Sequence, residues 1–226
     1  MKKLVYVLVF LLASVPSFAQ YFPTTSNNNY YEPRFQNTVG IENGSLLLSG
    51  FIGGGASVNK VDGVEWGQDG GLSAGAQLMG FPSKYLGVGV EISGSSFFET
   101  TDDSLYYYTN GYGYTYYDNM KVTASVLNIM FASRINFNPQ HRVRAYLPMG
   151  LGVGLARFET KMFNHSYTED STGFAYYVGM GLEVSLNSRF VLGVETRYNG
   201  FNFKFEDGEK VYPQYLTALL KVSAKF

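Results

Sequence analysis

Charged side chains recur inside segments in which apolar and polar residues alternate. Three are acidic and four are basic, and they come from six of eight such segments: Glu91, Arg134, Arg144, Glu183, Glu195, Arg197 and Lys221. All fall on the polar side of the alternation, so a β-sheet places them on one face. Inside a narrow barrel they must pair, because an unpaired buried charge is costly. We predict an ion-pair network that fills a barrel interior; a gate or a narrow ion path is the alternative.

Glu195 and Arg197 stand two residues apart on the same strand face, so we expect them in one network. The other pairings depend on the stagger between strands, and the sequence leaves them open. We expect removal of the Arg197 side chain to lower the thermal stability of the fold.

An acyl-transferring or deacylating enzyme that uses a serine nucleophile needs a histidine close to that serine and to an acidic residue. The chain has two histidines. His141 falls in a predicted short turn. His165 precedes Ser166 in a predicted outer loop near Glu169–Asp170, while Asp103–Ser104 lie in another loop. This order of residues matches no hydrolase motif, and we predict that the protein is not an enzyme.

Three short acidic pairs are the remaining candidates for metal binding, at Asp102–Asp103, Glu169–Asp170 and Glu206–Asp207. None has the spacing of a calcium-binding loop, so we interpret them as solvated loop charges. The absence of cysteine from the sequence excludes disulfides and zinc–thiolate sites. The sequence predicts no metal and no cofactor.

Seven tyrosines surround an Asn-Gly pair in the segment 101–119: Tyr106, Tyr107, Tyr108, Tyr112, Tyr114, Tyr116 and Tyr117. Asn110–Gly111 is a strong signal for a tight hairpin turn, because a type I′ turn needs positive φ at both positions. We therefore expect the strands on either side to continue beyond the barrel as one hairpin, with tyrosines paired across it. Tyrosine is also a common recognition residue. The hairpin is either a binding site for a surface protein or glycan, or it has no ligand. In the second case its tyrosines belong to the aromatic girdle at the membrane interface and to an ordinary aromatic surface hairpin.

These side chains must be positioned by strands, because the alternation has a period of two. In the last run, for example, Leu220, Val222 and Ala224 alternate with Lys221, Ser223 and Lys225. Eight such runs cover approximately residues 46–58, 72–80, 85–93, 123–135, 143–156, 174–186, 190–199 and 216–226. Pro148 interrupts the fifth run, and we expect a β-bulge there because a closed sheet has no free edge.

The connections between the runs alternate in length. Short turns are predicted at 81–84, 136–141 and 187–188, and longer loops at 59–70, 101–119, 159–171 and 204–213. An antiparallel barrel with both termini on one side produces this rhythm, with short turns in the periplasm and long loops outside.

The first residues have the form of an export signal. Lys2 and Lys3 precede a short apolar stretch, and Ser17 and Ala19 fit a cleavage site. We therefore expect a signal peptide at 1–19, an irregular segment at 20–44 and a barrel at 45–226; a retained membrane anchor is the alternative. Loss of the two lysines changes the formal charge from −1 to −3, and with no basic patch we expect no nucleic-acid partner.

The composition distinguishes a membrane barrel from a soluble one. Only 15% of residues are charged, whereas soluble domains have roughly 25%. A soluble lipocalin-like barrel would place its polar face outside and coat it with charge. Here the polar face is rich in Gly and Ser, and the chain holds 19 Tyr and 18 Phe. We predict an all-β, eight-stranded antiparallel transmembrane up-and-down β-barrel.

Runs such as Tyr85–Glu91 and Val191–Tyr198, together with the signal peptide and the terminal Phe226, resemble small outer-membrane β-barrel proteins of Gram-negative bacteria. These are relatives of the transmembrane domain of outer membrane protein A and of virulence-linked eight-stranded barrels. The resemblance implies an outer-membrane location, with periplasmic termini and extracellular loops. It implies contact with lipid and lipopolysaccharide, and recognition of Phe226 by the barrel-assembly machinery. A structural or surface-contact role is expected, with a narrow passive channel as the alternative and a lipid A-modifying enzyme as the third reading.

Overall fold

A computed structural model describes residues 40–58, 70–109, 115–162, 165–204 and 210–226, all within the unit Asn37–Phe226. Side chains are described in these ranges except at 98–109, 115–120, 162, 204 and 210–211. The predicted signal peptide lies outside the described residues, as do most of the predicted irregular segment and the Asn110–Gly111 turn.

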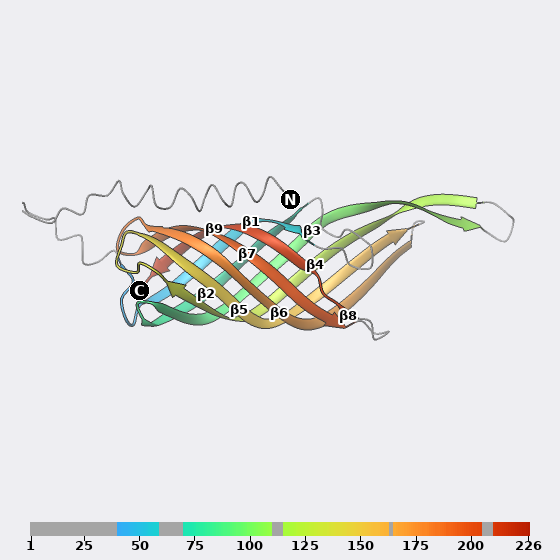
Figure 1. The fold of residues 1–226 in the computed structure, drawn as a ribbon. Helices are drawn as coiled ribbons and strands as arrows, with labels where there is room; N and C mark the ends of the chain where they lie inside the picture. The colour runs from blue at the N-terminus through green and yellow to red at the C-terminus, as the bar shows by residue number, and fades with distance from the viewer. Residues whose placement is uncertain (1–39, 59–69, 110–114, 163–164, 205–209) are drawn as a thin grey trace, which may run out of the picture. The chain divides into compact units, whose positions relative to one another are not determined.

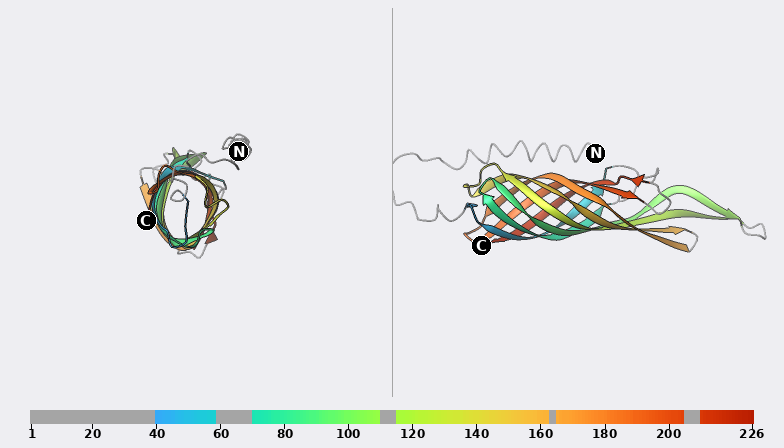
Figure 2. Two further views of the ribbon diagram at one scale, coloured as in Figure 1. Left: turned by 90° about the vertical axis from the view of Figure 1, so that its left-hand side faces the viewer. Right: turned by 90° about the horizontal axis from the view of Figure 1, so that it is seen from below.

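The described residues form a closed antiparallel β-barrel (Figures 1 and 2). Its strands are β1 (Leu46–Ser57), β2 (Gly71–Ser83), β3 (Leu86–Thr109), β4 (Thr115–Asn136), β5 (Val143–Met162), β6 (His165–Ser185), β7 (Phe190–Lys204), β8 (Lys210–Val211) and β9 (Gln214–Lys225). Each long strand pairs with the next, and β9 closes the ring by pairing with β1 and β7. The two-residue β8 only extends the end of β7. The predicted eight-stranded barrel is therefore confirmed. No helix in the described ranges has the length and apolar character needed to cross a membrane.

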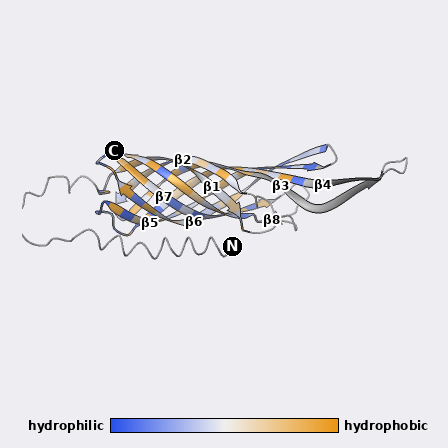
Figure 3. Ribbon diagram, turned by 90° about the horizontal axis from the view of Figure 1, so that it is seen from above, coloured by the Kyte–Doolittle hydropathy of each residue, from blue (hydrophilic) through white to orange (hydrophobic). Residues whose placement is uncertain are grey.

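The two faces of the wall have the predicted polarity. Apolar residues of the alternation point outward, as for Leu151, which is 57% exposed, while Arg144 on the same strand is fully buried inside. Figure 3 shows this alternation as orange and blue bands along the strands. The apolar outer band is the surface that a bilayer would cover.

One short turn differs from the prediction. The link between β2 and β3 contains only Lys84 and Tyr85, because β2 continues through Ser83. A register shift between Gly80 and Ser83 accommodates Pro82, and Phe81 points into the lumen. β2 therefore continues through Pro82 and Ser83, which favour a turn, and its residue Phe81 is buried in the lumen.

The predicted bulge at Pro148 is wrong. Tyr146 pairs with Gly181 and Met149 pairs with Val178, so the register to β6 is the same on both sides of the proline. Pairing to β6 is interrupted at Leu147 and Pro148, while Pro148 still aligns with Arg134 of β4. A two-residue gap on one side accommodates the missing N–H without an extra residue.

Two of the predicted long loops are mainly strand. The β3–β4 ladder continues to Thr109 opposite Thr115, and the β5–β6 ladder continues to Met162 opposite His165. Tyr107 aligns with Tyr117 and Tyr108 with Tyr116, as expected for one long hairpin. β-Branched and tyrosine residues support pairing even where strands leave the barrel. Tyr112 and Tyr114 lie outside the described residues.

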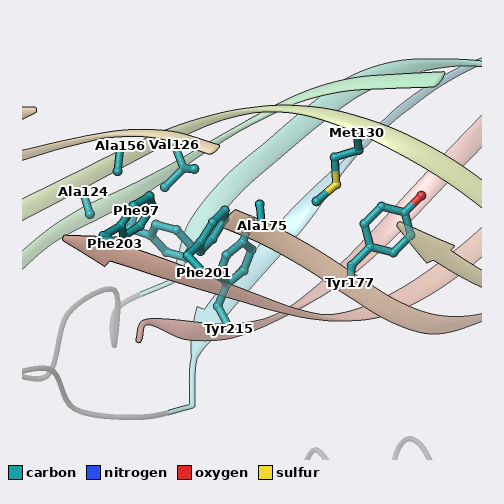
Figure 4. Packing of buried hydrophobic residues seen from close by; sticks show 10 residues of the cluster. All are labelled: Phe97, Ala124, Val126, Met130, Ala156, Ala175, Tyr177, Phe201, Phe203 and Tyr215. Carbon is teal, nitrogen blue, oxygen red and sulfur yellow. The ribbon is translucent and has the colours of Figure 1, made fainter. Parts of the chain in front are cut away.

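The interior has three layers along the barrel axis. At the end with the short turns, Ile41 packs with inward side chains of four strands: Leu47, Met79, Phe81, Ala132 and Val191. Polar and charged residues occupy the middle. At the other end an aromatic cluster gathers around Phe97, Phe201, Phe203 and Tyr215 (Figure 4). Apolar layers therefore lie above and below the central charges.

Candidate functional site

The polar layer of the lumen contains all seven predicted interior charges. Each is at most 3% exposed. They come from β3 to β7 and β9, and the alternation of each strand points them inward. The structure divides them into two groups, which we call the Glu183 group and the Glu91–Glu195 group.

The Glu183 group joins three neighbouring strands. Arg134 donates a bidentate pair of hydrogen bonds to Glu183, at 2.9 Å from Nη1 and 2.7 Å from Nη2. Arg144 donates from Nε to Oε1 of the same carboxylate at 2.8 Å. One carboxylate therefore accepts from two buried guanidinium groups, and geometry of this kind makes strong charge-assisted bonds.

The Glu91–Glu195 group is centred on Arg197. This guanidinium donates to Glu91 at 2.5 Å and 2.9 Å, and its Nε donates to Glu195 on the same strand. The expected link between Glu195 and Arg197 is thus present. The ammonium of Lys221 lies 3.5 Å from the Glu195 carboxylate.

Neutral side chains that the sequence analysis did not select complete the Glu91–Glu195 group. Gln77 donates to Glu91 at 2.9 Å and accepts from Lys221 at 2.7 Å. Tyr146 donates to Glu195 at 2.7 Å and Tyr177 to Glu91 at 3.1 Å. All three lie on inward positions of their strands, so the alternation itself was the signal that could have identified them.

Aromatic rings cover the two central guanidinium groups. The Arg134 carbon Cζ lies 5.0 Å from the ring centre of Phe81 and 4.4 Å from that of Tyr146. Arg197 lies similarly between Phe51, at 4.7 Å, and Tyr177, at 4.1 Å. Such cation–π contacts strengthen when the charge is desolvated. The layer is therefore a packed and hydrogen-bonded filling of the lumen.

Gly181 provides the space that the Tyr146 ring occupies. A Cβ at this position would lie 2.2 Å from the ring carbon Cζ of Tyr146. We expect Gly181→Ala to displace the ring from Glu195 and to lower the free energy of unfolding by about 1–3 kcal/mol. The measurement is urea unfolding in lipid vesicles. Gly50→Ala is the control, since a Cβ there meets nothing within 4 Å; equal stability of the two variants would contradict this role of the glycine.

The outer parts of β5 and β6 carry exposed ion pairs. Arg157 donates to Asp170 at 2.7 Å and 3.0 Å, and Ser166 donates to Glu159 at 2.9 Å. These residues lie beyond Leu155, the last apolar side chain on the outer face of β5. Hydrogen bonds from Arg157 hold the pKa of the Asp170 carboxyl below its ordinary value, and the bond from Ser166 does the same for the pKa of Glu159. Both carboxylates therefore stay ionised at neutral pH.

The predicted location of His165 in an outer loop is wrong, because His165 begins β6. His165 and Ser166 are consecutive strand residues, so their side chains point to opposite sides of the ribbon. Ser166 donates to Glu159, and the His165 ring lies 6.5 Å from the ring of Tyr167. Glu169 and Asp170 are likewise strand residues. The structure does not bring a serine and a histidine together here. His141 lies in the 137–142 connection, as predicted.

The remaining predicted features are only partly described. Phe226 is 73% exposed, and its backbone exchanges two hydrogen bonds with Leu46, at 2.8 Å and 2.9 Å. Its role in assembly stays a prediction. The side chains at 102–103 and of the hairpin tyrosines lie outside the described set, as do residues 206–207. Among the described residues, no group of three or more His, Asp or Glu side chains is placed to hold a metal ion.

Comparison with known proteins identified one family and several similar structures. The model of the family described as "Outer membrane protein beta-barrel domain" matches residues 6–226. The chain is similar to the N-terminal barrel domain of Pseudomonas aeruginosa OprF, with 14% identity, coverage of 81% of this chain and 98% of that one, and a TM-score of 0.44. It is also similar to Yersinia pestis Ail in complex with the heparin analogue sucrose octasulfate, with 17% identity, coverage of 82% of this chain and 100% of that one, and a TM-score of 0.46. A third similar structure is P. aeruginosa OprG, with 13% identity, coverage of 83% of this chain and 98% of that one, and a TM-score of 0.45. No curated protein matched.

Proposed function

Because the chain belongs to the outer membrane protein β-barrel family, we propose that it is a non-enzymatic envelope protein that makes surface contacts through the outer ends of its strands. The observation that carries this proposal is the continuation of β3–β4 and β5–β6 beyond the closed wall. The last residue of β3 that pairs with β2 is Phe97, and the paired residues within 98–109 pair with β4 alone among the described strands. From Phe97 onward the partners on β4 run from Ala124 to Thr115, so at about 3.4 Å per residue the ribbon reaches roughly 30 Å past that point.

The β5–β6 ribbon offers a strand edge for such contacts. The last residue of β6 that pairs with β7 is Gly173, so the segment 165–172 pairs only with β5 within the described chain. It contains neither Lys nor Pro, and its acidic residues are Glu169 and Asp170. An extended segment of a partner protein would add to this edge through backbone hydrogen bonds. Under this proposal the ribbons face outward and the short turns face the periplasm.

The packed lumen argues against the narrow channel. A passing ion would have to break the bidentate bonds of Arg134 or Arg197 and displace the rings of Phe201 and Phe203. Breaking buried ion pairs is expensive. In planar bilayers, steady unitary conductance that changes in Glu195→Gln would favour the channel and contradict this reading.

The β3–β4 hairpin is the part whose removal tests the proposal. We expect a variant in which residues 106–117 are replaced by an Asn-Gly turn to lose at least tenfold in binding to its surface ligands. The measurement is retention of glycans and surface proteins on the immobilised barrel in detergent. The barrel itself should stay folded, because the deleted residues lie beyond the closed wall.

A matched control replaces the seven tyrosines of the hairpin by threonine, which keeps the strand propensity. Loss of binding in both variants assigns recognition to tyrosine, and loss in the deletion alone assigns it to the ribbon backbone. If the complete protein and both variants retain the same ligands, the proposal fails.

A further inference from the structure

A short segment before β1 crosses the mouth of the lumen at the end with the short turns. We call residues 40–45 the strap. β1 and β5 lie on opposite sides of the ring, because three long strands separate them in each direction. The strap starts at the β4–β5 connection, where the N–H of Ile41 donates to the carbonyl of Pro139 at 3.0 Å, and it ends where β1 begins at Leu46. In the end-on view of Figure 2 this blue segment lies inside the ring of strands.

The strap is tied to the barrel at both of its ends. The carbonyl of Gly40 accepts a hydrogen bond from Nζ of Lys225, at the end of β9, at 2.9 Å. A Cβ at Gly40 would lie 3.0 Å from the carbonyl oxygen of Pro139, so glycine permits the close approach of the two backbones. Next to β1, the N–H of Gly44 donates to the carbonyl of Phe81 at 2.7 Å. The strap is thus held at β9, at the β4–β5 connection and at β2.

Ile41 is the strap residue that enters the lumen. Its side chain is 1% exposed. It completes the inner apolar layer, whose other members all come from strands of the wall: Leu47, Met79, Phe81, Ala132 and Val191. This layer borders the Glu183 group, since the ring of Phe81 lies 5.0 Å from Cζ of Arg134. Ile41 therefore covers the buried ions from a segment that is not part of the wall.

The strap is attached far less strongly than the strands. β1 pairs continuously with β2 on one side and with β9 on the other. The described contacts between strap and wall are isolated hydrogen bonds and one buried side chain, while Glu42 and Asn43 are exposed. Segments with few buried contacts open at a lower free energy than core strands. Gly44, with φ of +83°, forms the corner between the strap and β1 about which such an opening would turn.

We propose that the strap is a lid that closes the short-turn mouth of the lumen, with Ile41 as its seal and Lys225 as its tether. In the closed state the lid excludes water from the inner apolar layer and from the Glu183 group, and exclusion of water strengthens buried ion pairs. The lid opens while the strands stay paired. It lies at the opposite end of the barrel from the two ribbons, so it is independent of the surface-contact role.

A reporter thiol in the inner apolar layer tests the seal, since the sequence contains no cysteine. Ala132→Cys places the thiol on β4, where the side chain is 0% exposed. We expect a charged thiol reagent to modify it slowly in detergent, and about tenfold faster or more when Ile41→Ser is added. Lys225→Met removes the tether and should raise the rate by a smaller factor. Glu42→Ser changes an exposed strap residue and is the matched control, with no change expected.

A second reporter distinguishes an open lid from a loosened barrel. Ala124→Cys lies in the aromatic layer at the other end of the lumen, where the side chain is 1% exposed. Its modification should stay slow in every strap variant. An unchanged rate for Ala132→Cys in Ile41→Ser overturns the seal. An equal rise at both reporters also overturns it, because the whole barrel would then have opened.

Hydrogen exchange tests whether the lid opens by itself. The N–H of Ile41 should exchange about tenfold faster or more than the paired N–H groups of β1. Gly40→Cys with Gln140→Cys fastens the strap to the β4–β5 connection, because a Cβ at Gly40 lies 3.1 Å from Cα of Gln140 and a disulfide can bridge so close an approach. Oxidation of this variant should slow exchange at Ile41, and reduction should restore it. Exchange of Ile41 at the same rate as β1 would mean that strap and wall open together, and it would overturn the lid.

Discussion

Arg197→Met is expected to lower the free energy of unfolding by about 3–5 kcal/mol, because it leaves two buried carboxylates without their shared cation. Arg197 holds both Glu91 and Glu195, and each of these side chains is at most 3% exposed. The methionine keeps most of the side-chain volume, so the loss reports charge compensation and not a cavity. Urea unfolding in lipid vesicles, followed by circular dichroism, measures the difference.

Arg157→Met provides the control for this variant. Arg157 also makes a bidentate pair, with Asp170, but both side chains are more than half exposed. Exposed pairs are screened by water and contribute little to stability. A loss of stability in Arg157→Met as large as that in Arg197→Met would contradict the view that the interior network, and not ion pairing in general, stabilises the barrel.

The sequence was sufficient to identify which residues face the lumen. The period of two determines the face of every residue once a strand is recognised, and Glu91 and Lys221 therefore point inward as predicted. The same rule could not pair them. Glu91 and Arg197 are 106 residues apart, and their contact depends on the stagger of strands around the closed ring.

The differences from the prediction arose where local signals compete with pairing. The segment at 159–171 contains turn-forming and charged residues, yet the β5–β6 ladder continues through most of it. Cross-strand partners such as Arg157 and Asp170 support the ribbon there, and a single sequence does not reveal which residues will face each other. Pro148 was misjudged for a related reason, since the position of its missing N–H relative to each neighbour depends on the register.

Gln77 and Tyr146 show a further gap in what the sequence reveals. Neither is charged, yet both complete the hydrogen bonding of buried carboxylates. Burial of a charge requires that its remaining hydrogen-bonding positions be satisfied, so neutral polar residues on the same face belong to the site as much as the ions do. The seven charges do face the lumen, but the hydrogen-bonded network also includes neutral residues such as Gln77 and Tyr146.

Glu183→Gln is expected to have a comparably large effect, a loss of about 3–5 kcal/mol in unfolding free energy, for the opposite electrostatic reason. It leaves the buried guanidinium groups of Arg134 and Arg144 facing each other without the carboxylate that accepts from both. Unfolding of this variant in lipid vesicles is compared with Glu159→Gln, a carboxylate at the exposed outer end of β5. Unchanged stability in Glu183→Gln would show that the Glu183 group stabilises the barrel only by occupying volume in the lumen, and not through its charges.

The effect of the charges on stability can be separated from the effect of packing by replacing all three ions of the Glu183 group. In the triple variant Arg134→Met, Arg144→Met and Glu183→Leu, no ion remains without a partner, and apolar side chains of similar volume occupy the layer. Replacing a complete buried ion group in this way is often neutral or stabilising, whereas removing one member is not. We therefore expect the triple variant to unfold at higher urea concentration than Glu183→Gln alone. A triple variant less stable than the single one would mean that the ions contribute net stability, because their mutual bonds would then exceed the cost of burying them.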